Sequence, residues 1–481
     1  MPLNRTVQVV GISAVVGAVL AAVAVAAAGP WDAGQRTAER SYAASHSAAS
    51  RSAGAKHAAP HAASGTPCGA TAPGGSAGCG GVDIVGAHAP AAGPVFAAAG
   101  SGRAPASLAP DLAARLGPLM AAPGLGTVRT GSVLDVASGQ VLYDRGSRTA
   151  MTPASTTKLA TAVAALGTLG DAYTLTTTAV ATADDRVVLV GGGDPTLTLD
   201  RLAADTAAAL HARGTDSVHL GYDTSYYSGP TLHPIGVNEN LAPVTALMAS
   251  EGRLDPGSTG PATRSLDPAR SAAQQFAHLL ESHGVTVTGT PKKASGAGGA
   301  RLAVHHSAPL DQLVERMLTD SDNDIAEALA RQVARASGQP LSFDGVAQAL
   351  PRVLRTYGVP LGKTVFTDGS GLNRADALSP AALTRLLALA ASPAHPELRP
   401  VLDGLPIAAF SGTLTSRFSA AAGAGVVRAK TGTLTGVNTI AGVTVTPAGR
   451  VLAFAFMTAG STSASVAESG LDALASEVAG V

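Results

Sequence analysis

Apolar residues recur along this chain with two spacings, which predict helices in some segments and strands in others. Between positions 310 and 333 they lie three or four residues apart, which predicts two amphipathic helices joined by a short polar connection. Short apolar runs bounded by turn residues predict strands instead, near 131–137 and 140–144 and again over 426–429, 438–445 and 451–457. A further helix is predicted from about residue 462. We expect the first and last strands to share one antiparallel sheet with helices on its faces.

The N-terminal segment has a different pattern, an apolar stretch almost free of charge from Val7 to Ala28. It is long enough to span a bilayer, and the small residues at its end also suit a signal-peptide cleavage site. Residues 1–28 are therefore predicted to be a signal peptide or a membrane anchor. Either one exports the rest of the chain, so we expect an extracytoplasmic protein that is membrane-anchored or secreted.

Residues 29–105 consist mainly of Ala, Gly, Ser and Pro and contain almost no large apolar side chains. Such a composition cannot bury enough surface to fold, which predicts a disordered spacer. The two cysteines of the chain, Cys68 and Cys79, lie inside it. A small disulfide loop between them is compatible with export, and neither is placed for catalysis.

The charges of the 481-residue chain balance, with 33 Lys and Arg against 33 Asp and Glu. A net charge of zero gives no reason to expect a nucleic-acid partner. The 12 histidines show no zinc-ligand spacing such as HExxH, so no metal is predicted, and no cofactor either.

The first candidate for chemistry is the sequence Ser-Thr-Thr-Lys at 155–158, which follows Thr152 and Pro153. Thr152 is predicted to cap a helix whose first residue is Pro153, which puts Ser155 in the first turn and Lys158 on the same face. A serine hydroxyl needs an adjacent base to become a nucleophile, and a buried lysine has a lowered pKa that suits it to that task. The alternative is a capped helix with an ordinary surface lysine.

The second candidate is Ser321-Asp322-Asn323, on the connection between the two amphipathic helices. A serine and an asparagine there can point into a cleft, one relaying a proton and the other holding a substrate amide. The alternative is that Asp320, Ser321 and Asp322 cap the helix that follows. For this motif alone, the cap is the simpler explanation.

The third candidate is Lys430-Thr431-Gly432-Thr433, which continues a strand-like run. On a strand beside a cleft, Lys430 and a threonine hydroxyl can hold a substrate carboxylate, and Gly432 lets the strand approach the substrate closely. The backbone N–H of Thr433 can then pair with that of Ser155 as an oxyanion hole. The alternative is an ordinary hairpin with a surface lysine.

Each motif alone is weak, but each occurs once and the three follow one another in this order. Together they resemble the motifs of the low-molecular-mass, class C penicillin-binding proteins, the D-alanyl-D-alanine carboxypeptidase/endopeptidase family. Five further segments fit the same family, at 131–145, 190–197, 243–248, 368–372 and 411–414.

The resemblance implies an α/β fold of the β-lactamase/transpeptidase type, an antiparallel sheet flanked by helices with an additional helical subdomain. It implies that Ser155 is the acylated nucleophile, that Lys158 is the general base, and that Ser321 and Asn323 relay a proton and orient the substrate. The substrate-binding strand, including the groups that hold the terminal carboxylate and complete the oxyanion hole, would then consist of Lys430, Thr431, Gly432 and Thr433.

The chain between Lys158 and Ser321 is too long for a loop and long enough for a domain. A large insertion at this place is also what the class C resemblance implies. We therefore expect a first catalytic part at 106–180, an inserted domain at 181–306 and a second catalytic part at 307–481.

The chain is thus predicted to be a serine-type D-Ala-D-Ala carboxypeptidase that can also act as an endopeptidase. Its partners would be peptidoglycan stem peptides and β-lactams. One alternative is a β-lactamase of the same fold, but Ser321 stands where the class C β-lactamases would have a tyrosine, and no class A glutamate motif is found. The other is a non-catalytic cell-wall-binding protein, which would tolerate loss of Ser155 or Lys158, and both are present.

Overall fold

The computed structural model describes residues 108–481 except 184, 259 and 419–420. The predictions of an export segment at 1–28, a spacer at 29–105 and a disulfide between Cys68 and Cys79 lie outside the described residues. None of the helices within the described part of the chain is both long enough and apolar enough to cross a membrane.

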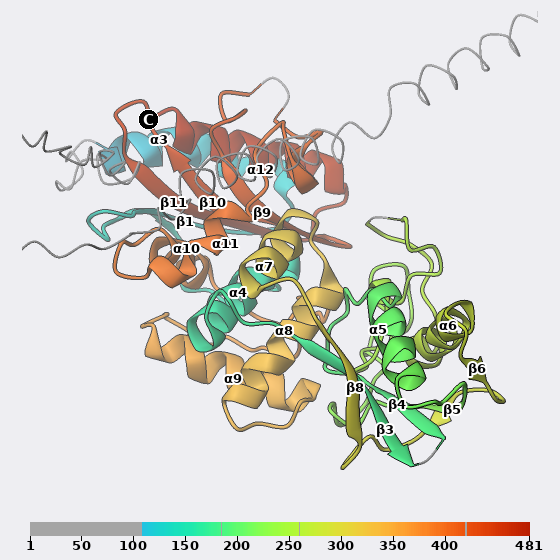
Figure 1. Ribbon diagram of the computed structural model, residues 1–481. Helices are drawn as coiled ribbons and strands as arrows, with labels where there is room; N and C mark the ends of the chain where they lie inside the picture. The colour runs from blue at the N-terminus through green and yellow to red at the C-terminus, as the bar shows by residue number, and fades with distance from the viewer. Residues whose placement is uncertain (1–107, 184, 259, 419–420) are drawn as a thin grey trace, which may run out of the picture. The chain divides into compact units, whose positions relative to one another are not determined.

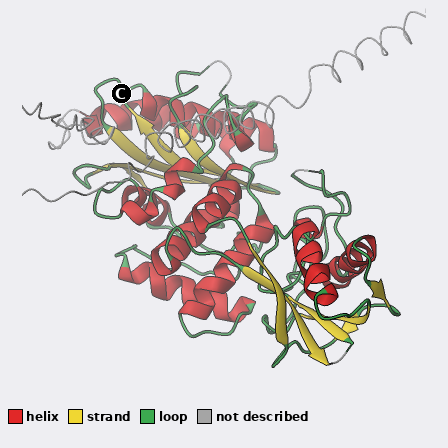
Figure 2. Ribbon diagram, in the orientation of Figure 1, coloured by secondary structure: helices red, strands yellow, loops and turns green. Residues whose placement is uncertain are grey.

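A five-stranded antiparallel sheet joins the two ends of the described chain (Figures 1 and 2). Its strand order is β2-β1-β11-β10-β9. The first and last of its strands pair directly, from Val128 opposite Ala459 to Asp135 opposite Leu452, so the predicted sharing of one sheet is confirmed. The bounds of the strands are β1 (Val128–Asp135), β2 (Val141–Arg145), β9 (Arg428–Leu434), β10 (Val437–Val445) and β11 (Val451–Ala459).

Helices cover both faces of this sheet, which explains why β10 and β11 are buried along nearly their whole length. Along β11 the side chains alternate: Phe454 and Phe456 pack with α3 and α12, whereas Ala453, Ala455 and Met457 pack with α10. The three helices are α3 (Leu108–Ala121), α10 (Pro380–Ala390) and α12 (Ala464–Ala479).

A helical part adjoins the α10 face of the sheet (Figure 1). At its centre α4 packs against α7, α8 and α9, and its residues from 157 to 166 are all buried. The predicted pair of amphipathic helices is confirmed as α7 and α8, joined at residues 320–322. The bounds are α4 (Thr157–Leu169), α7 (Leu310–Thr319), α8 (Asn323–Ala336), α9 (Phe343–Thr356) and α11 (Pro400–Asp403).

A second sheet is formed entirely by residues between Thr176 and His306, with the order β6-β5-β4-β3-β8 and β7 beside β5. It begins at Thr176, before the boundary expected at 181. Strand β3 pairs antiparallel with β4 and β8, while β4 and β5 are parallel, so the sheet is mixed. Its elements are β3 (Thr176–Ala183), β4 (Arg186–Val190), α5 (Asp200–His211), β5 (Ser217–Asp223), α6 (Pro268–Ser282), β6 (Thr286–Val287), β7 (Lys292–Lys293) and β8 (Ala300–His306).

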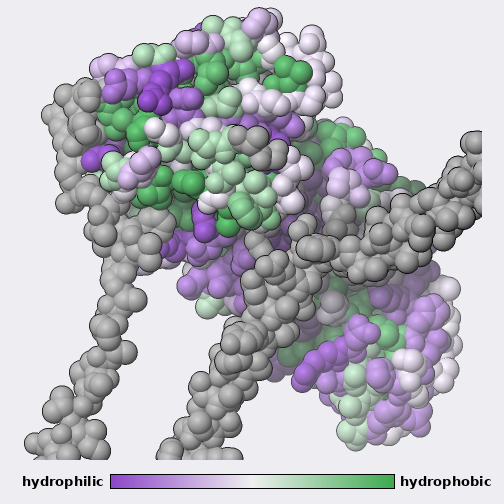
Figure 3. Space-filling model, turned by 90° about the horizontal axis from the view of Figure 1, so that it is seen from above, coloured by the Kyte–Doolittle hydropathy of each residue, from purple (hydrophilic) through white to green (hydrophobic). Residues whose placement is uncertain are grey.

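The remaining regular elements are single 3-10 turns: η1 (Pro123–Leu125), η2 (Ala154–Thr156), η3 (Ser250–Gly252), η4 (Pro396–Leu398) and η5 (Gly412–Leu414). Of these, η2 precedes α4 and packs against β9 and β10, so it lies between the helical part and the sheet. On the molecular face in Figure 3, hydrophilic and hydrophobic residues are intermixed.

Candidate active site

Ser155 lies in η2, immediately before α4. The predicted helix cap is wrong, because α4 begins only at Thr157 and neither η2 nor α4 has a side chain that accepts a capping hydrogen bond. The Thr152 hydroxyl donates to the carbonyl of Arg374 (3.2 Å). Ala154 has a φ of 49°, in the left-handed region that few non-glycine residues adopt. The chain therefore makes a tight turn at the serine, and the α-helix begins only after it.

Lys158 is completely buried in the first turn of α4, and three oxygen atoms surround its side-chain nitrogen. Nζ lies 3.0 Å from Oγ of Ser155, 2.6 Å from Oδ1 of Asn323 and 2.9 Å from the carbonyl oxygen of Ser370. Burial lowers the pKa of Lys158 to about 8. Four carboxyl groups act in the opposite direction: Asp368, Asp322, Glu327 and Asp324. Lys158 thus gives up its proton more readily than a lysine in water, as a base for Ser155 must.

Ser321 and Asn323 lie at the junction of α7 and α8, where the helical pattern placed them. Ser321 has a φ of 58°, so the chain turns sharply there, and Asp322 caps α8 through its side chain. The cap considered as an alternative is therefore present, but on Asp322. Asn323 accepts a hydrogen bond from Lys158 through Oδ1 and donates through Nδ2 to the carbonyl of Asn240 (2.9 Å).

Lys430 projects from β9, an edge strand of the five-stranded sheet, and is also completely buried. Its Nζ donates to Oγ of Ser321 (2.9 Å) and to the carbonyl of Thr431 (2.8 Å). Burial lowers the pKa of Lys430 well below its usual range, and the charge of Lys158 lowers it further. The site thus contains two buried lysines, each bonded to a serine of a different motif.

The two threonines of the β9 motif donate hydrogen bonds to groups outside the sheet. The Thr431 hydroxyl donates to Oγ1 of Thr413, and the Thr433 hydroxyl donates to Oε1 of Glu468, each over 2.9 Å. Among the described strands, β9 pairs only with β10. At the start of its other edge, Arg428 forms a single antiparallel bridge with Ile407, and the N–H of Ala429 donates to the carbonyl of Pro406 (3.0 Å).

Gly432 brings β9 against the serine turn. A Cβ at this position would lie 2.7 Å from the carbonyl oxygen of Pro153 and 3.0 Å from Cβ of Ala154, which is closer than packed atoms come. The sequence predicts that Gly432 lets the strand approach the substrate closely. In the structure, the close approach that it allows is between the strand and the turn that carries Ser155.

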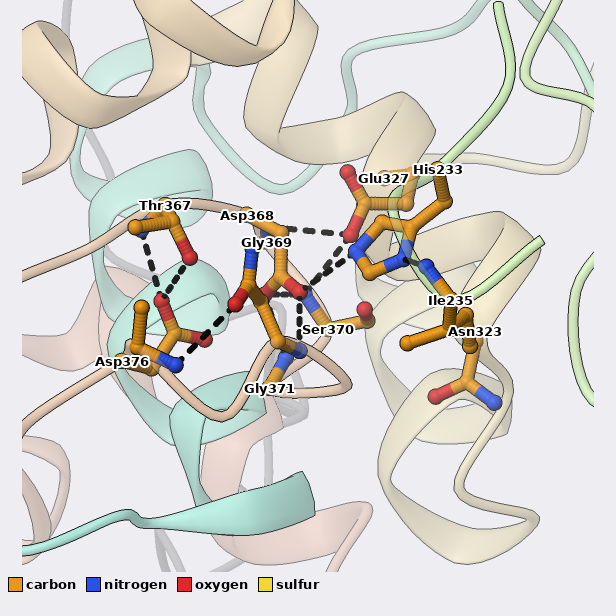
Figure 4. A network of polar contacts seen from close by, with 12 residues as sticks. His233, Ile235, Asn323, Glu327, Thr367, Asp368, Gly369, Ser370, Gly371 and Asp376 are labelled. Carbon is orange, nitrogen blue, oxygen red and sulfur yellow. Dashed lines mark hydrogen bonds and ion pairs between the residues drawn. The ribbon is translucent and has the colours of Figure 1, made fainter.

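The loop at 367–376 contributes to the site, although the sequence suggested no role for it beyond the family resemblance. Its Ser370 carbonyl accepts from Lys158, and two buried carboxylates hold the loop in place (Figure 4). Asp368 and Glu327 each accept a hydrogen bond from the backbone N–H of Ser370, over 3.1 and 3.0 Å. A backbone carbonyl has no side-chain signature, so sequence reasoning could not have found this contact.

The three motifs therefore meet in one place: Ser155 beside Lys158, Lys158 beside Asn323, and Ser321 beside Lys430. Such a site suits nucleophilic catalysis, since a serine hydroxyl and a lysine of lowered pKa lie within hydrogen-bond distance. Within the described residues, no three side chains of His, Cys, Asp and Glu gather in a way that could hold a metal ion.

Comparison with known proteins places the chain in a family. The D-Ala-D-Ala carboxypeptidase 3 (S13) family matches over residues 112–263 and 255–479. Carboxypeptidase DacB of Mycolicibacterium smegmatis is 38% identical over 376 residues, which cover 74% of this chain and 81% of that protein. A D-alanyl-D-alanine carboxypeptidase of Actinomadura sp. (strain R39) is 30% identical over 420 residues, with 68% and 77% covered.

The crystal structure of penicillin-binding protein 4 from Haemophilus influenzae has the same fold, with a TM-score of 0.64 at 22% identity. The likeness covers 77% of this chain and 98% of that one. The predicted fold of the β-lactamase/transpeptidase type is thereby confirmed. As the three motifs predicted, the chain belongs to the D-Ala-D-Ala carboxypeptidase 3 (S13) family of serine hydrolases.

Proposed function

We propose that this D-Ala-D-Ala carboxypeptidase works through an acyl-enzyme on Ser155, with Lys158 as the general base. The observation that carries the proposal is the 3.0 Å separation between Nζ of the buried Lys158 and Oγ of Ser155. The neutral amine takes the hydroxyl proton as Oγ attacks the carbonyl of the penultimate D-Ala, and the terminal D-Ala leaves with a proton on its nitrogen. Water then attacks the ester, which releases the shortened stem peptide and frees Oγ.

The other motif residues are proposed to hold the substrate and move the second proton. Lys430 donates to Oγ of Ser321, so the hydrogen of the Ser321 hydroxyl remains to be passed to the departing nitrogen. One N–H of the Asn323 amide is bonded to the inserted region, which leaves the other for a substrate carbonyl.

The β9 strand supplies the remaining contacts in this proposal. Lys430 and Thr431 would hold the terminal carboxylate, with Gly432 keeping the strand close to Ser155. The backbone N–H groups of Ser155 and Thr433 would form the oxyanion hole, since charge develops on the carbonyl oxygen during attack.

β-Lactams are proposed to acylate the same serine, since they present an amide carbonyl next to a carboxylate. The penicillin-binding protein 4 of Haemophilus influenzae, which shares this fold, has been crystallised with a β-lactam.

Peptidoglycan lies outside the cytoplasmic membrane, so we propose that residues 1–28 export the enzyme, as a cleaved signal or as an anchor. Cleavage of peptide crosslinks by the same acyl-enzyme route is part of the proposal.

Labelling with a fluorescent penicillin tests the nucleophile. The purified chain should bind the label covalently, and mass spectrometry of its peptides should place the adduct on Ser155. Ser155→Ala should lose the label, whereas Ser282→Ala, at an exposed serine of α6, should keep it. An adduct on another residue, or none where a known penicillin-binding protein is labelled, would refute the assignment. An adduct that hydrolyses quickly would instead favour the β-lactamase alternative.

The acylation rate at saturating substrate is expected to rise with pH through about 8. The base form of Lys158 is the unprotonated one, and its pKa is lowered to about 8 by burial. Below that pH the rate should fall about tenfold per unit, and above it the rate should level off. Measuring at saturation separates this step from carboxylate binding, in which the titration of Lys430 would appear. A rate independent of pH between about 6 and 9 would exclude Lys158 as the titrating base.

A further inference from the structure

The three neighbours of Lys158 Nζ determine how the base faces the nucleophile. A neutral lysine amine has two hydrogens and one lone pair. The oxygen atoms of Asn323 and Ser370 can only accept, so both hydrogens go to them. The lone pair is then left for the hydroxyl hydrogen of Ser155. Any group that fixes the positions of these two acceptors therefore orients the lone pair of Lys158 toward Ser155.

Asn323 is held from the inserted region. Its Nδ2 donates to the carbonyl of Asn240, and the N–H of Ala242 donates to Oδ1 of Asp324 (3.1 Å), the residue that follows. Asp324 also forms an ion pair with Arg264 (3.3 Å), whose side chain is 2% exposed while that of Asp324 is fully buried.

A second arginine of the inserted region reaches the other neighbour of Asn323. Arg253 lies 3.7 Å from the carboxylate of Asp322, and it is itself paired with Glu251. Glu251 also pairs with Arg316 of α7, so both helices that meet at this motif are tied to the inserted region. The side chains of Arg253, Glu251 and Asp322 are each at most 5% exposed.

Ser370, the second acceptor, is held from the same region through His233 (Figure 4). The N–H of Ile235 can only donate, and it donates to Nδ1 of His233 (3.2 Å). The hydrogen of the ring is therefore on Nε2, which donates to Oδ2 of Asp368 (2.9 Å). Asp368 in turn accepts the N–H of Ser370. The side chains of His233 and Asp368 are 1% and 0% exposed.

We propose that the inserted region positions the catalytic base through His233, Asn240, Arg253 and Arg264. His233 and Arg264 are its positioning residues: one holds the Ser370 carbonyl and the other holds Asn323, so that the lone pair of Lys158 points at Ser155. This inference rests on the proposed roles of Ser155 and Lys158. It gives the insertion a part in catalysis, although it contributes no atom to the reaction.

The same contacts set the electric field at Lys158. Facing it are the carboxyl groups of Asp322, Asp324 and Glu327 on or beside α8, that of Asp368 on the loop, and the side chain of Lys430 on β9. Burial and then Asp322 raise the pKa of Asp324, and Arg264 opposes both. The hydrogen bond from His233 lowers the pKa of Asp368, against the effect of burial. Loss of either partner raises the pKa of its carboxyl group, and a carboxyl group that is protonated no longer raises the pKa of Lys158.

Four single variants of the full chain test the proposal. His233→Leu removes the donor to Asp368, while His233→Gln keeps an N–H at similar reach. Arg264→Met removes the ion pair, while Arg270→Met removes an exposed pair with Asp267 in α6 and serves as the control. Fluorescent penicillin acylation is followed at saturation from about pH 6 to about pH 10, a range that spans the titration of a buried lysine. Thermal unfolding of each variant is measured in parallel with its acylation rate.

His233→Leu and Arg264→Met are expected to lower the plateau rate by about 10- to 100-fold, because a displaced reacting group costs about that much. Both should also move the pH midpoint downward. His233→Gln should recover most of the rate, and Arg270→Met should match the unaltered protein. A smaller folded fraction reduces the amount of label but moves neither the rate constant nor the midpoint, so a merely structural role would leave both unchanged.

Folded His233→Leu and Arg264→Met proteins with unaltered plateau and midpoint would overturn the proposal. If Arg264→Met does not fold, Arg264→Met/Asp324→Asn, which buries no unpaired charge, takes its place under the same criteria. Different results would refute the proposed function and the positioning role. No adduct on Ser155 in the unaltered protein refutes the proposed function, whereas an adduct formed equally fast in every variant refutes only the positioning role.

Discussion

Lys158→Arg is expected to lower the acylation rate by about 10²–10⁴-fold, the usual cost of losing general-base catalysis. Arginine keeps the positive charge but cannot give up its proton near neutral pH. It would also have to fit its larger guanidinium where Lys158 is completely buried. The measurement is the rate of penicillin acylation at saturation, with Lys363→Arg, at an exposed lysine, as the matched control.

Lys158→Met separates the two causes of that loss. Methionine removes the base without adding bulk, so it should be as slow as arginine if proton transfer is what the site has lost. A Lys158→Arg protein that acylates at a near-normal rate would mean that another group takes the proton from Ser155. Circular dichroism of both variants would show whether the fold survives.

Arg331→Met is expected to lower the free energy of unfolding by about 3–5 kcal/mol, the cost of leaving a buried charge without its partner. Arg331 and Glu327 are an ion pair four residues apart on α8, over 3.0 Å, and their side chains are 1% and 0% exposed. Burial raises the pKa of Glu327, Asp368 raises it further, and Arg331 opposes both. Arg331 also lies 4.3 Å above the ring of Phe343, so its removal loses packing as well.

The chain offers a matched control for this prediction on α5. Arg201 and Asp205 are also four residues apart and 3.5 Å from each other, but their side chains are 89% and 51% exposed. Arg201→Met should cost no more than about 0.5 kcal/mol, since exposed pairs on helices contribute little. Urea unfolding of both variants beside the unaltered protein gives the comparison. Equal losses at the two sites would show that burial is not what makes the pair on α8 important.

The sequence was most informative where chemistry depends on short spacing. Ser155 and Lys158 are three positions apart in the sequence, and the two are in contact. The polar connection between two amphipathic patterns predicted that Ser321 and Asn323 lie where α7 ends and α8 begins. Apolar runs predicted the first and last strands, which pair with each other in one sheet. In each case a local pattern carries the information.

The start of the serine helix could not be predicted in the same way. Thr152 and Pro153 are typical of a helix N-terminus, but the positive φ of Ala154 delays the helix. Alanine rarely adopts that conformation and gives no warning of it in a sequence. Packing of the turn against β9 at Gly432 holds it, and that contact joins residues far apart in the chain.

Contacts between distant segments also explain why the sequence predicts no catalytic role for the inserted region. Arg264 and Asp324, or His233 and Asp368, are ordinary charged or polar residues in sequence. Only folding brings each pair together and buries it. A buried charge needs a partner, so the role of each residue can be inferred only once its partner is known.

The position of β11 has a consequence for how the protein is made. This strand lies between β1 and β10, so the middle of the five-stranded sheet is the last of its strands to be synthesised. Until then, the β1–β2 hairpin and the β9–β10 hairpin have no strand to join them, and closing so distant a contact is slow. The strands between 176 and 306 need no later partner strand and can pair earlier. Until β11 has been synthesised, the sheet that carries β9 and Lys430 is therefore incomplete.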